Sequence, residues 1–292
     1  MLGDLVLDIV ATGSDAVERG TDVPATIRFR VGGSAANTAR SFARLGGRAA
    51  FIGAIGNDGW GRRMVAALRA AGVEVHVVRV AHPTARLVCI VDGHGERSFL
   101  TERGAADHLI AADIQPAWLA SAGALHIPGY SLFNRPIVEA ALAAASMAHE
   151  RGALVSVDLS SIRPMLTVGR DAAMTAIKAV GPAILFATNA EAEALAVPLL
   201  DLAPMVVVKS GSHGCQVLRR GSPPVSVATK PLAPADTTGA GDAFTAGFLW
   251  LLLDESAPAT DPWPTPLLRR AAGSGHAAAS IHLTSPRDEM TT

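Results

Sequence analysis

The feature that most constrains the fold is a regular alternation of short apolar runs with amphipathic segments. Six runs have the length of a strand: "GDLVLDIV", "AAFIGAIG", "GALHIPG", "ALVSVDL", "AILFATN" and "MVVVKSG". Helix-like stretches separate many of them, among them "SAANTARSFARLG" and "RPIVEAALAAASMAHERG". Strands that alternate with helices in this way predict an α/β protein with a mostly parallel sheet covered by helices on both faces.

Two stretches depart from this alternation. Residues 11–31 are polar and end in the alternating pattern "TIRFRV", and residues 84–101 have the pattern of a hairpin that turns at Asp92-Gly93. They are either ordinary surface hairpins or a small sheet that stands beside the core as a lid. The second interpretation divides the chain into a core of residues 1–10, 32–80 and 104–292, and a lid of residues 11–31 and 81–103.

Charge and composition exclude several classes of function. The formal net charge is −1 and no basic block stands out, which argues against a nucleic-acid partner. The longest apolar run, residues 243–253, is too short to cross a membrane, and Asp4 and Asp8 interrupt the first apolar stretch, so we expect no signal peptide and a cytoplasmic protein. Two isolated cysteines predict buried, reduced thiols.

The stretch "ADTTGAGDAFTAGFLWLL", residues 235–252, is the most informative in the chain. Gly239, Ala240 and Gly241 precede an apolar helix, whose unpaired N–H groups and partial positive charge form a phosphate-sized anion site. Asp242 in the first turn is either a partner for the helix dipole or a base that takes a proton from an attacking hydroxyl. The second interpretation predicts phosphoryl transfer.

This stretch resembles the C-terminal signature of the ribokinase-like sugar kinases, also called the phosphofructokinase-B-type carbohydrate kinases. The segment "GGSAANTARSFARLGGRAAFIGAIGNDGWG", residues 32–61, is similar to the N-terminal signature of the same family. Together the two motifs extend the resemblance to nearly the whole chain. The resemblance implies a three-layer α/β sandwich with a small β-sheet lid, and an ATP-dependent enzyme that phosphorylates an alcohol group.

The resemblance also implies roles for the residues around the second signature. Asp242 is expected to be the general base, and the backbone of Gly239, Ala240, Gly241 and Asp242 the anion hole. Asp236 and Thr238 match positions that help to bind a monovalent cation, usually potassium. Asp236 is alternatively a simple turn residue.

The acceptor site is expected at the start of the chain and at the return from the lid. Asp8, read as the end of the first strand, can accept two hydrogen bonds from neighbouring sugar hydroxyls. The other residues that match substrate-contacting positions are Gly32, Gly33, Asn37, Arg103 and Gly104. The alternative is that the glycines cap a helix and that Asn37 packs. The neutral Ser34 favours a neutral sugar, while Arg28, Arg30 and Arg86 leave an anionic one open.

The nucleotide side matches the family less closely. The resemblance makes Asn189, Lys209, Gly211, Gly214 and His276 cofactor-binding candidates, although His276 is alternatively a surface residue of a helix. The family's Asn-x-x-Glu motif for magnesium is altered here, because Ala192 stands third after Asn189. A shift of one residue at the helix start would bring Glu191 into that role, so the expected cofactors are ATP, Mg²⁺ and K⁺.

Three functions follow from these expectations. The first is a kinase for a neutral, ribose- or fructose-like sugar. The second is a nucleoside kinase of the same family, which needs an aromatic side chain to stack on the base; Phe99, Tyr130 and Phe133 are candidates. The third is a sugar-binding protein with impaired catalysis, suggested by the altered magnesium motif. A homodimer through the lid is expected, because a free sheet edge invites pairing.

Overall fold

The central sheet has six strands in the order β12-β11-β10-β9-β8-β7 in the computed structural model, which describes residues 1–13, 20–92, 97–232, 234, 236–260, 263–286 and 289–290. Its strands are β7 (Ala124–Pro128), β8 (Leu154–Asp158), β9 (Ile184–Thr188), β10 (Met205–Lys209), β11 (Cys215–Arg219) and β12 (Ser222–Val227). The strands from β7 to β10 are parallel, whereas β11 and β12 are antiparallel. The carboxyl ends of the parallel strands therefore meet at one edge.

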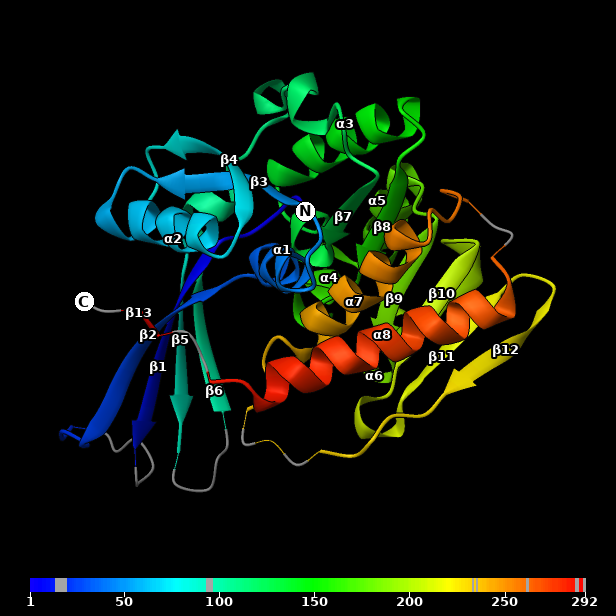
Figure 1. Ribbon diagram of the computed structural model, residues 1–292. Coiled ribbons are helices and arrows are strands. Elements are labelled where there is room, and N and C mark those ends of the chain that lie inside the picture. The colour runs from blue at the N-terminus through cyan, green and yellow to red at the C-terminus, as the bar shows by residue number, and fades with distance from the viewer. Residues whose placement is uncertain are drawn as a thin grey trace.

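Helices cover both faces of this sheet, as the alternation in the sequence predicts (Figure 1). On β9, Ile184 and Phe186 pack into one apolar cluster, and Leu185 and Ala187 into another. The first cluster includes α1 (Ser34–Arg44), α2 (Gly59–Ala70), α7 (Ala240–Asp254) and α8 (Thr265–Thr284). The second includes α3 (Ile137–Glu150), α4 (Ile162–Val168), α5 (Arg170–Val180) and α6 (Asn189–Leu195). No described helix is both long enough and apolar enough to cross a bilayer.

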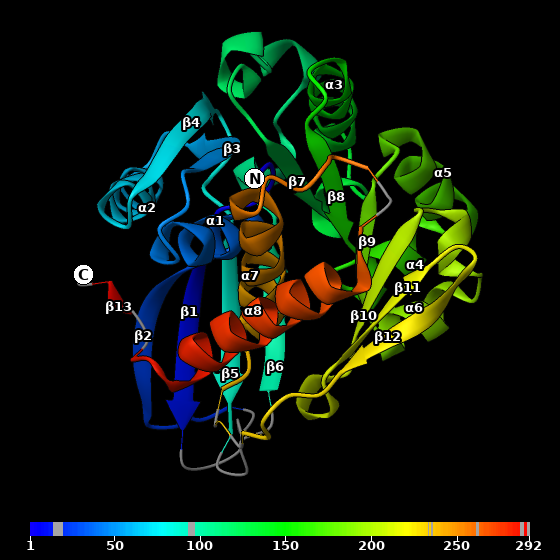
Figure 2. The same cartoon turned by 45° about the vertical axis from the view of Figure 1, so that its right-hand side comes forward.

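A separate two-stranded parallel sheet, β3 (Ala49–Gly56) and β4 (Val73–Val80), lies beside β7. Residues 1–3 run between the two sheets, where the N-terminus is marked in both ribbon views (Figures 1 and 2). The Leu2 N–H donates to the carbonyl of His126, at 3.0 Å, and the Gly3 N–H donates to that of Ile52, at 2.9 Å. The pattern of apolar runs gives no sign of this division, whereas the structure pairs β3 with β4 apart from the six-stranded sheet that ends at β7.

A cavity of about 600 Å³ opens beside Met1, at the amino ends of β3 and β7. We call it the N-terminal cavity; its lining includes Met1, Phe42, Trp118, His126, Trp250 and Asp254. The Met1 amine donates to the carbonyl of Ala50, at 2.8 Å, and burial lowers its pKa to about 5. Burial likewise lowers the pKa of His126 to about 3.

A small five-stranded sheet, the lid sheet, stands off the core in the order β13-β2-β1-β5-β6 (Figures 1 and 2). Its strands are β1 (Val6–Gly13), β2 (Ala25–Gly32), β5 (Arg86–Val91), β6 (Arg97–Glu102) and β13 (Glu289–Met290). Strands β5 and β6 are antiparallel, as the hairpin pattern predicts. Of the expected turn, Asp92 is described and residues 93–96 lie outside the described residues.

The first strand differs from the prediction in both its end and its sheet. Asp8 does not end a core strand, because β1 continues to Gly13 and pairs with β2 and β5 of the lid sheet. Residues 6–10 therefore belong to the lid sheet, although the sequence assigns them to the core. The sequence does not reveal this, because an apolar run has the same pattern in a core strand as in a strand of the lid sheet. The rest of the division into core and lid stays a prediction.

Candidate active site

Helix α7 begins at the glycine-rich stretch, and its first residues face the lid sheet. Gly239 has φ 80°, in the left-handed region that favours glycine, and a Cβ there would lie 2.8 Å from Nε2 of His282. The Nε2–H of His282 donates to the carbonyl of Thr238 at 2.8 Å, which holds the preceding loop against α8. Position 239 therefore has no room for a side chain.

Asp242 lies in the first turn of α7 and is held by two donors from α1. Its Oδ1 accepts a hydrogen bond from the Ser34 hydroxyl at 2.6 Å, and its Oδ2 accepts one from Nδ2 of Asn37 at 3.0 Å. Burial raises the pKa of Asp242 to about 7, although both hydrogen bonds and Lys209 act to lower it. A carboxyl group poised near pH 7 suits a general base.

Asp8 projects from β1 toward the same region, opposite Arg30 of β2. Burial, with repulsion from Asp4, raises the pKa of Asp8 to about 7, against the lowering effect of Arg30. A Cβ on Gly32 would lie 2.3 Å from Oδ2 of Asp8, so Gly32 leaves the space that the carboxyl group fills. This glycine therefore makes room for a side chain of the site.

Arg103 follows β6 and is fixed by two carboxylates. Its Nη1 lies 3.0 Å from Oδ2 of Asp4, its Nη2 lies 2.8 Å from Oδ1 of Asp107, and its guanidinium lies over the ring of Tyr130 at 5.1 Å. Gly33, with φ 99°, would place a Cβ 2.4 Å from the carbonyl oxygen of Asp4. The charge of Arg103 is thus matched by carboxylates before any ligand binds.

A buried ion pair joins the ends of β8 and β10. Nζ of Lys209 donates to Oδ2 of Asp158 at 2.5 Å, and the Thr245 hydroxyl donates to the same oxygen at 3.0 Å. Burial acts to raise the pKa of Asp158, but Lys209 outweighs it and holds that pKa below its usual range. A Cβ on Gly241 would lie 3.4 Å from Nζ, so this ammonium lies close to the start of α7.

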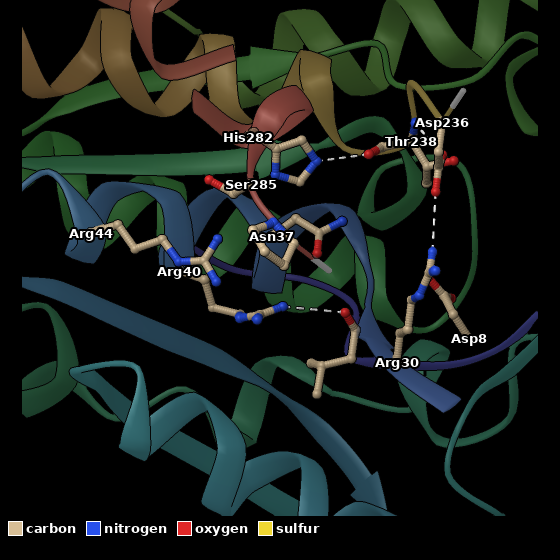
Figure 3. A pocket seen from close by; sticks show the side chains of 11 residues that line it. Asp8, Arg30, Asn37, Arg40, Arg44, Asp236, Thr238, His282 and Ser285 are labelled. Carbon is tan, nitrogen blue, oxygen red and sulfur yellow. Dashed lines mark hydrogen bonds and ion pairs between the residues drawn. The ribbon is translucent and has the colours of Figure 1, made fainter. Parts of the chain in front are cut away.

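These groups surround one cavity of about 310 Å³ at the carboxyl ends of the parallel strands, which we call the carboxyl-end cavity. The residues expected from the sequence that line it are Asp8, Gly33, Asn37, Arg103, Glu191, Lys209, Thr238, Gly239, Gly241 and Asp242. Asp8, Asn37 and Thr238 also line a smaller hollow with Asp236 (Figure 3). The structure therefore brings the two signature segments and the first strand together, as the sequence predicts.

Glu191 lines the carboxyl-end cavity from the first turn of α6. Its Oε2 accepts a hydrogen bond from the Thr188 N–H at 2.7 Å, in a capping box with the Thr188 side chain at the start of the helix. Burial raises the pKa of Glu191, and the charge of Asp158 adds to this effect. A carboxylate that lines the cavity fits magnesium, which takes few protein ligands and keeps several waters.

Four residues expected to bind the nucleotide lie outside the lining of this cavity: Asn189, Gly211, Gly214 and His276. Nδ2 of Asn189 donates to the Ser210 hydroxyl at 3.0 Å, and His276 packs edge-on against Phe244. Their roles stay predictions. Ala240, Gly32 and Gly104 are likewise not among the lining residues, although each lies next to one.

Sequence reasoning missed three contacts of the site. Ser34 is read only as a neutral residue near the acceptor, yet its hydroxyl makes the shorter hydrogen bond to Asp242. The ion pairs Arg103–Asp4 and Lys209–Asp158 are not predicted, because each joins segments that lie far apart in the chain. For Asp158 and Lys209 the signal available was their position at the ends of β8 and β10, because side chains converge at the carboxyl ends of parallel strands.

The comparisons with known proteins agree with this geometry. The model of the pfkB family of carbohydrate kinases matches residues 1–289. The chain belongs to this family. The resemblance inferred from the two signatures is thereby confirmed, and with it the activity class: a phosphotransferase whose acceptor is an alcohol group of a sugar.

Similar proteins include fructokinases and an adenosine kinase. A fructokinase of Klebsiella pneumoniae is 31% identical over 265 residues, which cover 85% of this chain and 82% of that protein. The crystal structure of a fructokinase from Vibrio cholerae with fructose, ADP and calcium has a TM-score of 0.78 at 26% identity and covers 98% of this chain and 92% of that one. The adenosine kinase from Sinorhizobium meliloti has a TM-score of 0.81 at 27% identity, covering 97% and 93%. The ribokinase-like fold is therefore confirmed.

Proposed function

We propose that this pfkB-family kinase transfers the γ-phosphoryl group of ATP to a hydroxyl of a neutral sugar, with Asp242 as the general base. The observation that carries the proposal is the position of Asp242: it lies at the start of α7, in the same cavity as Asp8, with a pKa of about 7. An acceptor bound at Asp8 meets a base poised to take its proton.

The backbone from Gly239 to Asp242 supplies the anion hole in this proposal. The N–H groups at a helix N-terminus stabilise the negative charge that develops on the transferred phosphoryl group. The ammonium of Lys209 lies beside Gly241 and is held there by the Asp158 carboxylate, so it can donate toward a phosphate at this end of the cavity. Ser34 and Asn37 orient the Asp242 carboxylate through their hydrogen bonds.

The neutral acceptor is supported by the pairing of the lid arginines. Arg28 is bound to Glu289 at 3.1 Å, Arg30 to Asp236 at 3.1 Å, and Arg86 to Glu102 at 2.8 Å. In the sequence these three arginines are the reason to consider an anionic acceptor, but in the structure each is paired with a carboxylate. Because several relatives are named fructokinases, fructose is the first acceptor to test, followed by ribose.

ATP and Mg²⁺ complete the proposal. Glu191 is the residue that would hold magnesium, through water, and the ion would neutralise phosphate charge when bound. This position supports catalysis over the alternative of a binding protein that has lost it, because a carboxylate lines the cavity despite the altered motif. Asn189, Lys209, Gly211, Gly214 and His276 remain the nucleotide-side candidates.

A nucleoside acceptor is the second candidate, favoured by the likeness to an adenosine kinase. It needs an aromatic face free to stack on a base. Tyr130 lines the carboxyl-end cavity, but the guanidinium of Arg103 lies over its ring. Phe133 is buried and Phe99 lies on β6, outside the lining. These positions favour a sugar.

A homodimer through the lid sheet also belongs to the proposal. The strand register places Ile27 and Leu100 on the face opposite to Asp8 and Arg30, and these two side chains are 58% and 64% exposed. Exposed apolar groups on a sheet face favour association with a second copy. Sedimentation of wild type and of Leu100→Glu, which we expect to be monomeric, tests this.

A panel of neutral sugars and nucleosides with ATP and Mg²⁺, scored by ADP release and by the phosphorylated product, tests the function. We expect turnover with a neutral hexose or pentose and a much lower kcat/KM with nucleosides. Absence of turnover with every acceptor would overturn the proposal. Binding of a sugar without ADP release would instead support the binding protein.

A further inference from the structure

The loop that leads into helix α7 is held by two arginines of the lid sheet. Nη1 of Arg30 on β2 lies 3.1 Å from Oδ2 of Asp236, and Nη1 of Arg97 on β6 lies 3.0 Å from Oδ1. The same Arg97 nitrogen donates to the Thr238 hydroxyl at 3.1 Å. Figure 3 shows the Arg30–Asp236 contact beside the small hollow.

Asp236 and Thr238 are the residues expected to help bind a monovalent cation, and their side chains do not fit that ion here. Both carboxylate oxygens of Asp236 already face a guanidinium, and the Thr238 hydroxyl accepts from one of the two. The Thr238 N–H also donates to Oδ1 of Asp236 at 2.9 Å. A third positive charge at this carboxylate would be repelled by the two guanidinium groups.

We infer that Arg30 and Arg97 supply the positive charge that a bound monovalent ion would supply, so that catalysis by this chain is independent of potassium. This rests on the proposed function. The arginines are positioning residues: they fix Asp236, which lies three residues before Gly239, and so fix the loop that enters the anion hole. The three side chains are 18%, 20% and 29% exposed, which shelters the pairs from full solvent screening.

The two arginines also link the acceptor site to the anion hole. Asp8 is the register partner of Arg30 in the β1–β2 pair. Strand β1, which carries the Asp8 carboxylate of the acceptor site, is thus hydrogen-bonded to β2, whose Arg30 holds the anion-hole loop. A freely exchanging ion would not connect the lid sheet to this loop, whereas a covalently attached guanidinium does.

Kinetics at constant ionic strength test the inference. We expect kcat/KM of the wild type to change less than twofold when tetramethylammonium chloride is replaced by 100 mM KCl. We expect Arg97→Gln and Arg30→Gln to lose at least tenfold in kcat without K⁺ and to regain part of it with K⁺, and Arg97→Lys to keep most of its activity. Arg86→Gln, which removes a lid arginine that contacts Glu102 instead, is the matched control and should match the wild type.

A readout without turnover separates this inference from the proposed function. The melting temperature of the wild type should be equal in KCl and tetramethylammonium chloride, whereas that of Arg97→Gln should be higher in KCl. A wild type that K⁺ activates tenfold or stabilises specifically would overturn the inference. So would arginine variants that keep full activity without K⁺, or inactive variants that neither K⁺ nor Arg97→Lys restores.

Discussion

The N-terminal cavity lies at the amino ends of β3 and β7, and the carboxyl-end cavity at the carboxyl ends of β8, β9 and β10. Their buried ionisable groups behave differently. In the N-terminal cavity, burial lowers the pKa of the Met1 amine to about 5 and that of His126 to about 3, so both are neutral near pH 7. In the carboxyl-end cavity, Asp8 and Asp242 have pKa values of about 7 and remain able to exchange protons there.

The cavity that holds the proton-exchanging carboxyl groups is the smaller of the two. The N-terminal cavity encloses about 600 Å³ and the carboxyl-end cavity about 310 Å³. The larger one is bordered by Phe42, Trp118 and Trp250, whereas the smaller one places carboxylates, an ammonium and a helix N-terminus within reach of one ligand. The comparison teaches that convergence of polar groups with poised pKa values, rather than volume, identifies the site.

The strongest test of this difference removes one carboxylate from each cavity, and helix α7 carries both of them. Asp242→Asn should lower kcat by about 10²- to 10⁴-fold, because the acceptor hydroxyl loses its base. Asp254→Asn, at the other end of α7 and in the N-terminal cavity, is the matched control and should leave kcat unchanged. Steady-state kinetics with the best acceptor measure both. Equal losses in the two variants would contradict the distinction.

The buried Lys209–Asp158 pair should give the next largest effect. Lys209→Met leaves the Asp158 carboxylate buried opposite no cation, which should lower the free energy of unfolding by about 3–5 kcal/mol. Denaturant unfolding measures this change. The double variant Lys209→Met with Asp158→Asn removes the unpaired charge and should recover part of the loss. A single variant as stable as the wild type would show that the pair does not hold this end of the sheet.

The Met1 amine predicts a pH effect at the other end. Its folded pKa of about 5 lies below the ordinary value of 8.0, so between these pH values the unfolded chain binds a proton that the folded chain does not. The free energy of unfolding should therefore gain up to about 4 kcal/mol from this group as pH rises from 5 to 8.

Two extended chains isolate that contribution. Four apolar residues or four Gly/Ser residues joined to Met1 both replace the ammonium with an amide, so each should lose this part of the pH dependence. Only the apolar extension should also raise stability at pH 8, by filling the cavity. Denaturant unfolding from pH 5 to pH 8 compares the three chains. An unchanged pH dependence in both extended chains would contradict the burial of the amine.

The smallest expected effect concerns the pH profile of the carboxyl-end cavity. The kcat/KM of the wild type should rise with pH through about 7, as Asp242 loses its proton. Ser34→Ala removes a hydrogen bond that lowers the pKa of Asp242, so this rise should shift upward by about half a unit to one unit. Ser41→Ala, on the same helix α1, is the control. A shift to lower pH would contradict the role of Ser34.

Much of the fold and of the candidate site could be predicted from the sequence. The alternation of runs predicts the layered sheet, and the two glycine-rich signatures predict which segments meet, because glycine is needed where Gly239 adopts a positive φ and where Gly32 makes room for Asp8. Asp8 could be identified as an acceptor residue even though its strand belongs to a different sheet from the one predicted.

The rest depends on contacts between distant segments, which carry no local signal. No spacing in the sequence shows that Arg97 meets Asp236 or that Lys209 meets Asp158. The sequence likewise does not reveal that the first apolar run leaves the core after residue 3. An apolar run of eight residues has the same pattern whether it pairs with core strands or with lid strands. The structure places Glu191 in the first turn of α6, which the spacing after Asn189 does not reveal, and the role of Glu191 toward magnesium stays a prediction.

The position of Met1 has a consequence for handling the protein. Its nitrogen donates a hydrogen bond to the Ala50 carbonyl inside the fold, and the next two residues hydrogen-bond to β7 and β3. An affinity tag fused to this end would start inside the N-terminal cavity, whose lining includes Trp118 and Trp250. A bulky or charged leader should therefore reduce the yield of folded enzyme, whereas a cleavable tag placed elsewhere avoids that interference.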